Sequence, residues 1–209
     1  MQHFSDGEVK KTLRALVSWS VRGLIVGGIG GGSTERAYCD AAVKVRGGTI
    51  KDTADLRQEL ATTIPDDKTF QEAFERARMT RPRIARYLMI ALQKETSGEA
   101  EPELVPNDNE DEVNLEHVLP KSPTAADWPS FTSEEAANWV HRLGNLALLA
   151  KGPNGRIGNK PFSEKRPILA DSALTLTSEI AANEDWTEAE IAARQVELAA
   201  LAVKTWPRG

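Results

Sequence analysis

A histidine, a carboxylate and three asparagines follow one another in the second half of this alanine-rich chain of 209 residues. Glu116 and His117 are adjacent, and Asn145, Asn154 and Asn159 come after them. A histidine with an ordinary pKa of about 6.5 can take a proton from water near pH 7. Mg²⁺ prefers oxygen ligands and keeps several waters, so one or two carboxylate or amide oxygens can hold it. These residue types therefore suit metal-assisted hydrolysis of a phosphodiester.

Charge is distributed unevenly around these residues. The net charge is −5, but residues 141–167 hold six Lys or Arg residues and a single acid, Glu164. Phosphate binding depends on such local charge rather than on the sum. We favour contacts with the DNA backbone, over simple surface positions, for Lys151, Arg156, Lys160 and Lys165. An upstream basic run is either a set of solvated helix faces or a further phosphate contact: Arg76, Arg78, Arg81, Arg83 and Arg86.

The bulk composition, with 40% hydrophobic and 27% charged residues, is that of a globular protein. No run approaches the roughly 18 apolar residues of a membrane-spanning helix, and the first residues lack the apolar centre of a signal peptide. We therefore expect a cytoplasmic protein that does not enter a membrane. The single cysteine, Cys39, excludes an internal disulfide and a cysteine-based zinc site. We expect it to be a small buried side chain.

Two short strands are predicted to carry the candidate residues. Val113–Leu119 alternates apolar and polar side chains and stops at Pro120, while Leu143–Leu149 is an apolar run. A loop at residues 152–155 and a helix starting at about Asn159 follow. The sequence therefore predicts a strand pair, a loop and a helix around the site.

Helices are predicted over most of the remaining chain. Capping boxes at Ser5–Glu8, Thr132–Glu135 and Thr187–Glu190 mark three helix starts. The expected helices cover about 6–22, a segment starting near 33, 53–62, 68–79, a segment from 83, a short one ending near 140, and 187–205. Four tryptophans are expected in the core rather than as base-stacking platforms: Trp128, Trp139, Trp186 and Trp206.

At this point the motifs become recognisable. EHVLP, then HRLGNLALL, then N-x₄-N-x-PF-x-x-K resemble the HNH (His-Me finger, ββα-metal) endonucleases. In particular they resemble the C-terminal domain of GmrSD-type restriction enzymes, which SspE-like phosphorothioate-dependent phage-defence nucleases share. The segment ARYLMIAL, the W-x₄-I-x₂-R spacing of Trp186, Ile191 and Arg194, and the closing Trp206-Pro207 are also similar to that family.

The resemblance implies a role for each candidate. His117 becomes the general base, and Asn145 fixes the loop of the finger and orients that base. Glu116 matches the acidic metal ligand and Asn154 the later one, while Asn159 is either a ligand or a helix cap. Neighbours on a regular strand point to opposite faces, so Glu116 and His117 reach one ion only if the strand twists or ends there.

His141 does not share this support. We expect it at a helix end or packed under the second strand, as part of the scaffold.

The resemblance also implies a fold and a function. We expect a mainly α (α+β) protein in which a helical scaffold carries an inserted two-stranded ββα-metal finger. The expected parts are an N-terminal helical lobe at 1–98, an acidic linker at 99–112, the finger at 113–170, and C-terminal helices at 171–209 that pack on the lobe. The eight acids and the absence of Lys or Arg between 99 and 116 suggest the linker.

The implied activity is that of a Mg²⁺-dependent endonuclease or nickase in a modification-dependent restriction or phage-defence protein. Mn²⁺ is a possible substitute, and double-stranded DNA is the expected substrate. Relatives carry an N-terminal ParB-like nucleotide-hydrolysing domain that these residues do not resemble, so we expect a fragment or a split subunit. The alternatives are a catalytically inactive DNA-binding or assembly module of a defence complex and a purely helical interaction domain.

Overall fold

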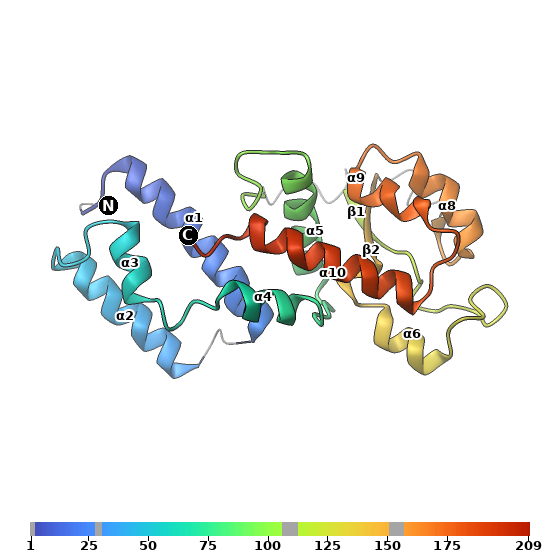
Figure 1. Ribbon diagram of the computed structural model, residues 1–209, viewed down its shortest axis with the longest axis horizontal. Helices are drawn as coiled ribbons and strands as arrows, with labels where there is room; N and C mark the ends of the chain where they lie inside the picture. The colour runs from blue at the N-terminus through green and yellow to red at the C-terminus, as the bar shows by residue number, and fades with distance from the viewer. Residues whose placement is uncertain (1–2, 28–30, 106–112, 151–156) are drawn as a thin grey trace. The chain divides into compact units, whose positions relative to one another are not determined.

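The computed structural model describes residues 3–27, 31–105, 113–150 and 157–209 (Figure 1). Within these ranges the fold is mainly helical, with one sheet of two antiparallel strands. This confirms the expected mainly α (α+β) class. The chain divides into two compact units, one of residues 1–74 and 202–209 and the other of residues 75–201. No helix in the described ranges is long and apolar enough to cross a membrane.

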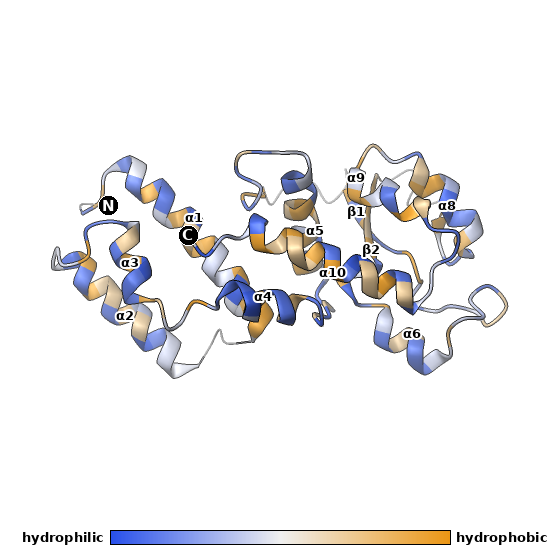
Figure 2. Ribbon diagram, viewed as in Figure 1, coloured by the Kyte–Doolittle hydropathy of each residue, from blue (hydrophilic) through white to orange (hydrophobic). Residues whose placement is uncertain are grey.

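The first unit is helical. Its elements are α1 (Asp6–Val26), α2 (Gly32–Arg46), α3 (Thr53–Glu59) and α4 (Asp67–Phe74). Apolar and polar residues alternate along α1, as expected for a helix that buries one face (Figure 2). The buried face of α1 contributes Trp19 to a core that also holds Ile50 and Leu60. A second cluster joins the rings of Phe70 and Phe74 to that of Trp206.

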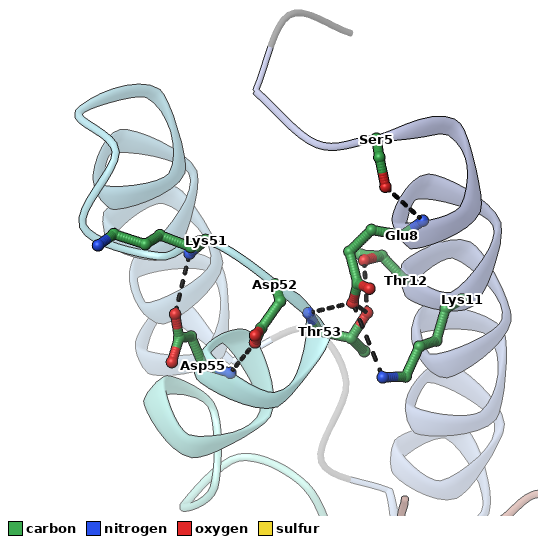
Figure 3. A network of polar contacts seen from close by, with 8 residues as sticks. All are labelled: Ser5, Glu8, Lys11, Thr12, Lys51, Asp52, Thr53 and Asp55. Atoms are coloured by element: carbon green, nitrogen blue, oxygen red, sulfur yellow. Dashed lines mark hydrogen bonds and ion pairs between the residues drawn. The ribbon is translucent and has the colours of Figure 1, made fainter.

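Glu8 connects α1 to the start of α3 (Figure 3). Ser5 caps α1 as predicted, since its hydroxyl accepts from the Glu8 backbone N–H at 3.3 Å. The Glu8 carboxylate accepts from the Thr53 backbone N–H at 2.6 Å and from the Thr53 hydroxyl. These hydrogen bonds hold the pKa of Glu8 below its ordinary value. The Glu8 carboxylate thus accepts hydrogen bonds from Thr53, the first residue of α3.

A buried arginine ties the last residues of the chain into this unit. Arg22 donates to the carbonyls of Trp206 at 2.6 Å and Pro65 at 3.0 Å, and to the Asp67 carboxylate at 2.6 Å. Its guanidinium also lies 4.8 Å from the centre of the Phe70 ring. One side chain therefore satisfies two carbonyls and stacks on an aromatic face.

The second unit contains the strands. Its elements are α5 (Pro82–Thr96), β1 (Val113–His117), α6 (Ser133–Trp139), η1 (Leu143–Asn145), β2 (Leu146–Ala150), α8 (Phe162–Ala170), α9 (Thr175–Ser178), η2 (Glu179–Ala182) and α10 (Glu188–Thr205) up to residue 201. Its core includes Trp128, Phe162 and Trp186, and the Phe162 and Trp186 rings stack with centres 5.6 Å apart.

Helix α5 packs against both strands and α9 packs against β2. Arg86 of α5 donates to the Val113 carbonyl at the start of β1 at 2.8 Å. The Gln93 side chain accepts from the Leu176 backbone N–H at 3.0 Å. The Thr177 hydroxyl donates to the Leu148 carbonyl of β2 at 2.8 Å. Because α5 packs with the strands, the unit boundary falls between residues 74 and 75 rather than at the acidic segment 99–112.

Several sequence expectations change in detail. The strand expected at Leu143–Leu149 begins only at Leu146, because residues 143–145 form a 3₁₀ turn. The helix expected at 68–79 ends at Phe74. Cys39 is exposed, so the prediction that it is buried is wrong. The core placement of the tryptophans is confirmed: Trp128, Trp186 and Trp206 are buried, and Trp139 packs partly buried against the core that holds Trp128 and Trp186.

Candidate active site

The site lies where β1 ends. β1 and β2 pair antiparallel in regular register, with Glu116 opposite Ala147 and His117 opposite Leu146 as the last pair. Immediately afterwards the Val118 backbone N–H donates to the Asn145 carbonyl at 3.0 Å. The residue after His117 is therefore hydrogen-bonded to the turn that precedes β2.

Asn145 holds this junction together with its side chain, which is fully buried. Its amide nitrogen donates to the carbonyls of Leu119 and Val140, both at 3.0 Å. Its amide oxygen accepts from the Leu119 backbone N–H at 2.7 Å and from the Trp186 indole N–H at 3.1 Å. Four hydrogen bonds use the full capacity of a side-chain amide. Asn145 is thus a positioning residue that joins the loop after His117 to the end of α6.

Helix α10 supports the same turn. Arg194, buried, donates to the carbonyls of Gly144 at 2.7 Å and Leu146 at 2.8 Å. The Gln195 side chain accepts from the Gly144 backbone N–H at 2.5 Å. A Cβ at Gly144 would lie 2.2 Å from the Ile191 carbonyl oxygen, so only glycine allows this approach.

Glu116 forms an ion pair with Lys165 of α8. The Lys165 ammonium donates to the Glu116 carboxylate and to the His117 carbonyl, both at 2.9 Å, and lies 6.0 Å from the centre of the Trp128 ring. The Lys165 side chain is fully buried and that of Glu116 is 13% exposed. Burial raises the pKa of Glu116 and lowers the pKa of Lys165, while their mutual attraction opposes both shifts. The short contact fits an ionised pair.

This geometry corrects the role expected for Lys165. Its ammonium is enclosed by Glu116, the His117 carbonyl and Trp128, and so is not presented to a DNA backbone in solvent. Lys160 is exposed as expected, and forms an ion pair with Glu164 at 3.3 Å. Lys151, Arg156 and Asn154 lie outside the described residues.

His117 contacts a second histidine. Its ring meets that of His141 edge to face, with centres 5.7 Å apart and an interplanar angle of 82°. Burial, and then the positive charges of Lys121, His141 and Lys165, lowers the pKa of His117 to about 4. The imidazole is therefore neutral at pH 7, the form that accepts a proton.

The position of His141 is the feature that sequence reasoning missed. His141 does lie at a helix end, as expected, since α6 ends at Trp139, but this end adjoins His117. Its Nδ1 is buried and, among the described residues, has no hydrogen-bond partner. A signal was available in the sequence. If Asn145 holds the loop after His117, then His141, four residues before Asn145, is brought close to His117.

The donors present fit a divalent ion in part. Glu116 supplies a carboxylate of the kind Mg²⁺ prefers, but Lys165 already neutralises it. In the described ranges no group of three or more His, Cys, Asp or Glu side chains could hold a metal. Asn159 lies in an exposed turn, and because Pro161 is the N-cap of α8, the helix-cap prediction for Asn159 is wrong. The predicted metal-ligand roles of Asn154, which lies outside the described residues, and of Asn159 stay predictions.

Glu116 and His117 also contact different neighbours. Glu116 meets Lys165 on α8, and the His117 ring meets His141 after α6. The strand keeps its register through the His117–Leu146 pair and ends at His117, which is one of the two conditions under which both side chains could reach one ion. That both reach one ion stays a prediction.

Comparison with known proteins assigns the family. A search of curated proteins finds no match. The family model for the C-terminal domain of GmrSD restriction endonucleases matches residues 64–201, which include both strands, the histidine pair and the supporting part of α10. This match covers most of the chain, and the protein therefore belongs to the family of GmrSD restriction endonuclease C-terminal domains.

Proposed function

We propose that this chain is the cleaving domain of a modification-dependent restriction or phage-defence system, and that it is a metal-dependent, HNH-type DNA endonuclease or nickase. The observation that carries the proposal is the placement of His117 at the end of β1, with the loop beyond it held by Asn145. Its imidazole is neutral at pH 7, and the backbone beyond it is fixed by Asn145. A neutral base held on a rigid support is what the deprotonation of water requires.

In this proposal His117 takes the proton from the attacking water. Asn145 keeps the loop after the base in place without touching the substrate. Glu116, Asn154 and Asn159 would hold Mg²⁺ or Mn²⁺, which when bound would neutralise charge on the scissile phosphate. Lys165 keeps Glu116 ionised and braces the His117 carbonyl, so that the carboxylate and the base stay together at the strand end. Lys151, Arg156 and Lys160 would contact the DNA backbone.

The test is the conversion of supercoiled plasmid to open-circular or linear DNA by the full chain with Mg²⁺. We expect cleavage with Mg²⁺ or Mn²⁺ and none when EDTA removes the metal. The assay is run on phosphorothioate-modified and unmodified plasmid, and with a ParB-like nucleotide-hydrolysing partner supplied, because we propose that modification and partner control cleavage. No cleavage under any of these conditions would contradict the enzyme proposal.

One observation favours a second candidate function. The ammonium of Lys165 already occupies Glu116, the single carboxylate at the strand end. If that pair excludes the metal, the domain is a catalytically inactive DNA-binding or assembly module. Isothermal titration with Mn²⁺ separates the two: the nuclease predicts binding that weakens in Glu116→Gln, and the inactive module predicts no metal binding.

A further inference from the structure

Cationic side chains from two separate segments act on the histidine pair, Lys121 on both rings and Arg78 on that of His141. Lys121 follows β1 and is exposed, Arg78 precedes α5 and is exposed, and His141 follows α6. The backbone explains how Arg78 arrives there. Residues 78 and 142 form an isolated antiparallel bridge, and the Met79 backbone N–H donates to the His141 carbonyl at 2.8 Å. A segment distant in sequence is thus fastened to the chain at His141.

The guanidinium of Arg78 is held by one hydrogen bond, which leaves most of its N–H donors available. One of its nitrogens donates to the Ala137 carbonyl of α6 at 2.7 Å. A guanidinium has five N–H donors in a planar fork, so one hydrogen bond leaves donors for a phosphate. The bond also reduces the freedom that Arg78 would lose on binding a ligand, since one end of its guanidinium is already held at the Ala137 carbonyl.

Positive charges act on both histidines. Lys121 lowers the pKa of both His117 and His141, and Arg78 lowers that of His141. Yet the whole chain has more acids than bases, 31 Asp and Glu against 26 Lys and Arg. A local excess of cations in an acidic protein is unfavourable in the free state and is relieved by an anion.

We propose that Arg78, Lys121 and His141 form the phosphate-binding side of the active site, which holds a backbone phosphate of the DNA strand presented to His117. This rests on the proposed nuclease function. It selects Arg78 from the upstream basic run, for which a phosphate contact was one of two readings, and it adds Lys121 and His141, which were not among the expected DNA contacts. Arg78 supplies a fork that matches two phosphate oxygens, Lys121 supplies a mobile point charge, and the neutral imidazole of His141 supplies one N–H donor. Such contacts position the strand without reading its sequence.

Arg78 and Lys121 take the place of Lys165, which was expected to contact DNA but is enclosed. A backbone phosphate at His117 needs cations that are exposed to solvent, whereas the ammonium of Lys165 is buried beside Glu116. Arg78 and Lys121 are exposed, and both lower the pKa of His141, whose ring contacts that of His117.

The test compares Arg78→Gln/Lys121→Gln with a matched variant, Lys10→Gln/Arg36→Gln, which removes the same charge from exposed positions of the first unit. Binding of the full chain to duplex DNA is measured by fluorescence anisotropy in EDTA across a series of salt concentrations. We expect the slope of log affinity against log salt to fall by about one for each phosphate contact removed. The matched variant should keep the slope of the intact protein, and Arg78→Lys/Lys121→Arg should restore most of the affinity.

His141 is tested by two replacements that separate its contacts. His141→Phe keeps an aromatic ring against His117 but has no donor, whereas His141→Gln keeps a donor. We expect His141→Phe to lower the plasmid-cleavage rate about tenfold, by loss of an oriented hydrogen bond to phosphate, and His141→Gln to retain most of it. Equal rates for the two variants would contradict the role of His141.

The outcomes separate this proposal from the nuclease assignment. Equal salt slopes for the intact protein and Arg78→Gln/Lys121→Gln, or an equal loss in Lys10→Gln/Arg36→Gln, would overturn the phosphate site while leaving the nuclease intact. No binding of the intact chain to DNA would also overturn it. A smaller salt slope in Arg78→Gln/Lys121→Gln than in the intact protein, together with no plasmid cleavage by the intact protein, would retain the phosphate site and reject the nuclease. Circular dichroism on each variant verifies the fold.

Discussion

His117 is a neutral base because of where it lies. Burial disfavours the imidazolium, and the positive charges of Lys121, His141 and Lys165 disfavour it further, which together bring the pKa to about 4. In the unfolded chain the same imidazole has an ordinary pKa of about 6.5. The residue type could be predicted to act as a base from the sequence. The depressed pKa could not, because two of the neighbouring charges come from distant segments.

The pKa of His117 predicts a pH dependence of stability. Between pH 6.5 and about 4 the unfolded chain binds a proton that the folded chain does not, so the free energy of unfolding falls as the pH is lowered through this window. His141, whose pKa burial also lowers, acts with the same sign. Urea unfolding of the metal-free protein at pH 7 and pH 5 measures the change, and His117→Gln should reduce it. An NMR titration that gives His117 a pKa near 6.5 would contradict this account.

The ion pair of Glu116 and Lys165 predicts a non-additive result. Lys165→Met leaves a mostly buried carboxylate without its cation and should lower the free energy of unfolding by about 3 kcal/mol. Glu116→Gln/Lys165→Met removes both charges and should recover a large part of that loss. Denaturant unfolding of the two single variants and the double variant measures the coupling. Simple addition of the two single effects would mean that the pair does not form.

At the scale of elements, the turn between α6 and β2 organises the site. A strand throughout Leu143–Leu149, as the apolar run predicts, would not bring both groups of the Asn145 amide to Leu119. The 3₁₀ turn does so, and it is stabilised by contacts from α10 that are about 50 residues away. The role of Asn145 could therefore be inferred from a motif, whereas the local conformation depends on packing that no local pattern reveals.

Gly144 tests the support that α10 gives to this turn. Gly144→Ala would place a Cβ 2.2 Å from the Ile191 carbonyl oxygen, and backbone must move to relieve the overlap. We expect a loss of about 3 kcal/mol in the free energy of unfolding, together with reduced plasmid cleavage. Gly7→Ala is the control, since a Cβ there meets nothing within 4 Å and Ala favours a helix. Equal stabilities of the two variants would show that α10 does not approach Gly144 closely.

At the scale of the whole molecule, each unit has its own buried cation. Arg22 satisfies carbonyls in the first unit, and Arg194 does so in the second. The sequence predicted the fold class and most helix starts, because capping boxes and apolar periodicity are local. The compact units divide between residues 74 and 75, which the sequence did not predict, because the packing of α5 on the strands is not a local signal. The linker at 99–112 stays a prediction.

The contacts of Arg22 predict that the stability of the first unit depends on the attachment of its last residues. Arg22→Leu leaves the carbonyls of Trp206 and Pro65 without their donor and should lower the free energy of unfolding by about 3 kcal/mol. Lys68→Leu, which removes an exposed cation 3.9 Å from Glu72, should change it by less than about 1 kcal/mol. Urea unfolding monitored by tryptophan fluorescence compares them. Similar effects of the two substitutions would mean that Arg22 does not hold the chain end.

The central claim is that His117 activates water for cleavage of DNA. The most direct measurement is the rate constant for the first nick in supercoiled plasmid, with Mg²⁺ and any required partner, for the intact protein and for His117→Ala. The account predicts a rate lower by about 10²- to 10⁴-fold in His117→Ala, with the circular dichroism spectrum and the affinity for DNA retained. Cleavage by a folded His117→Ala protein at the rate of the intact chain would contradict it.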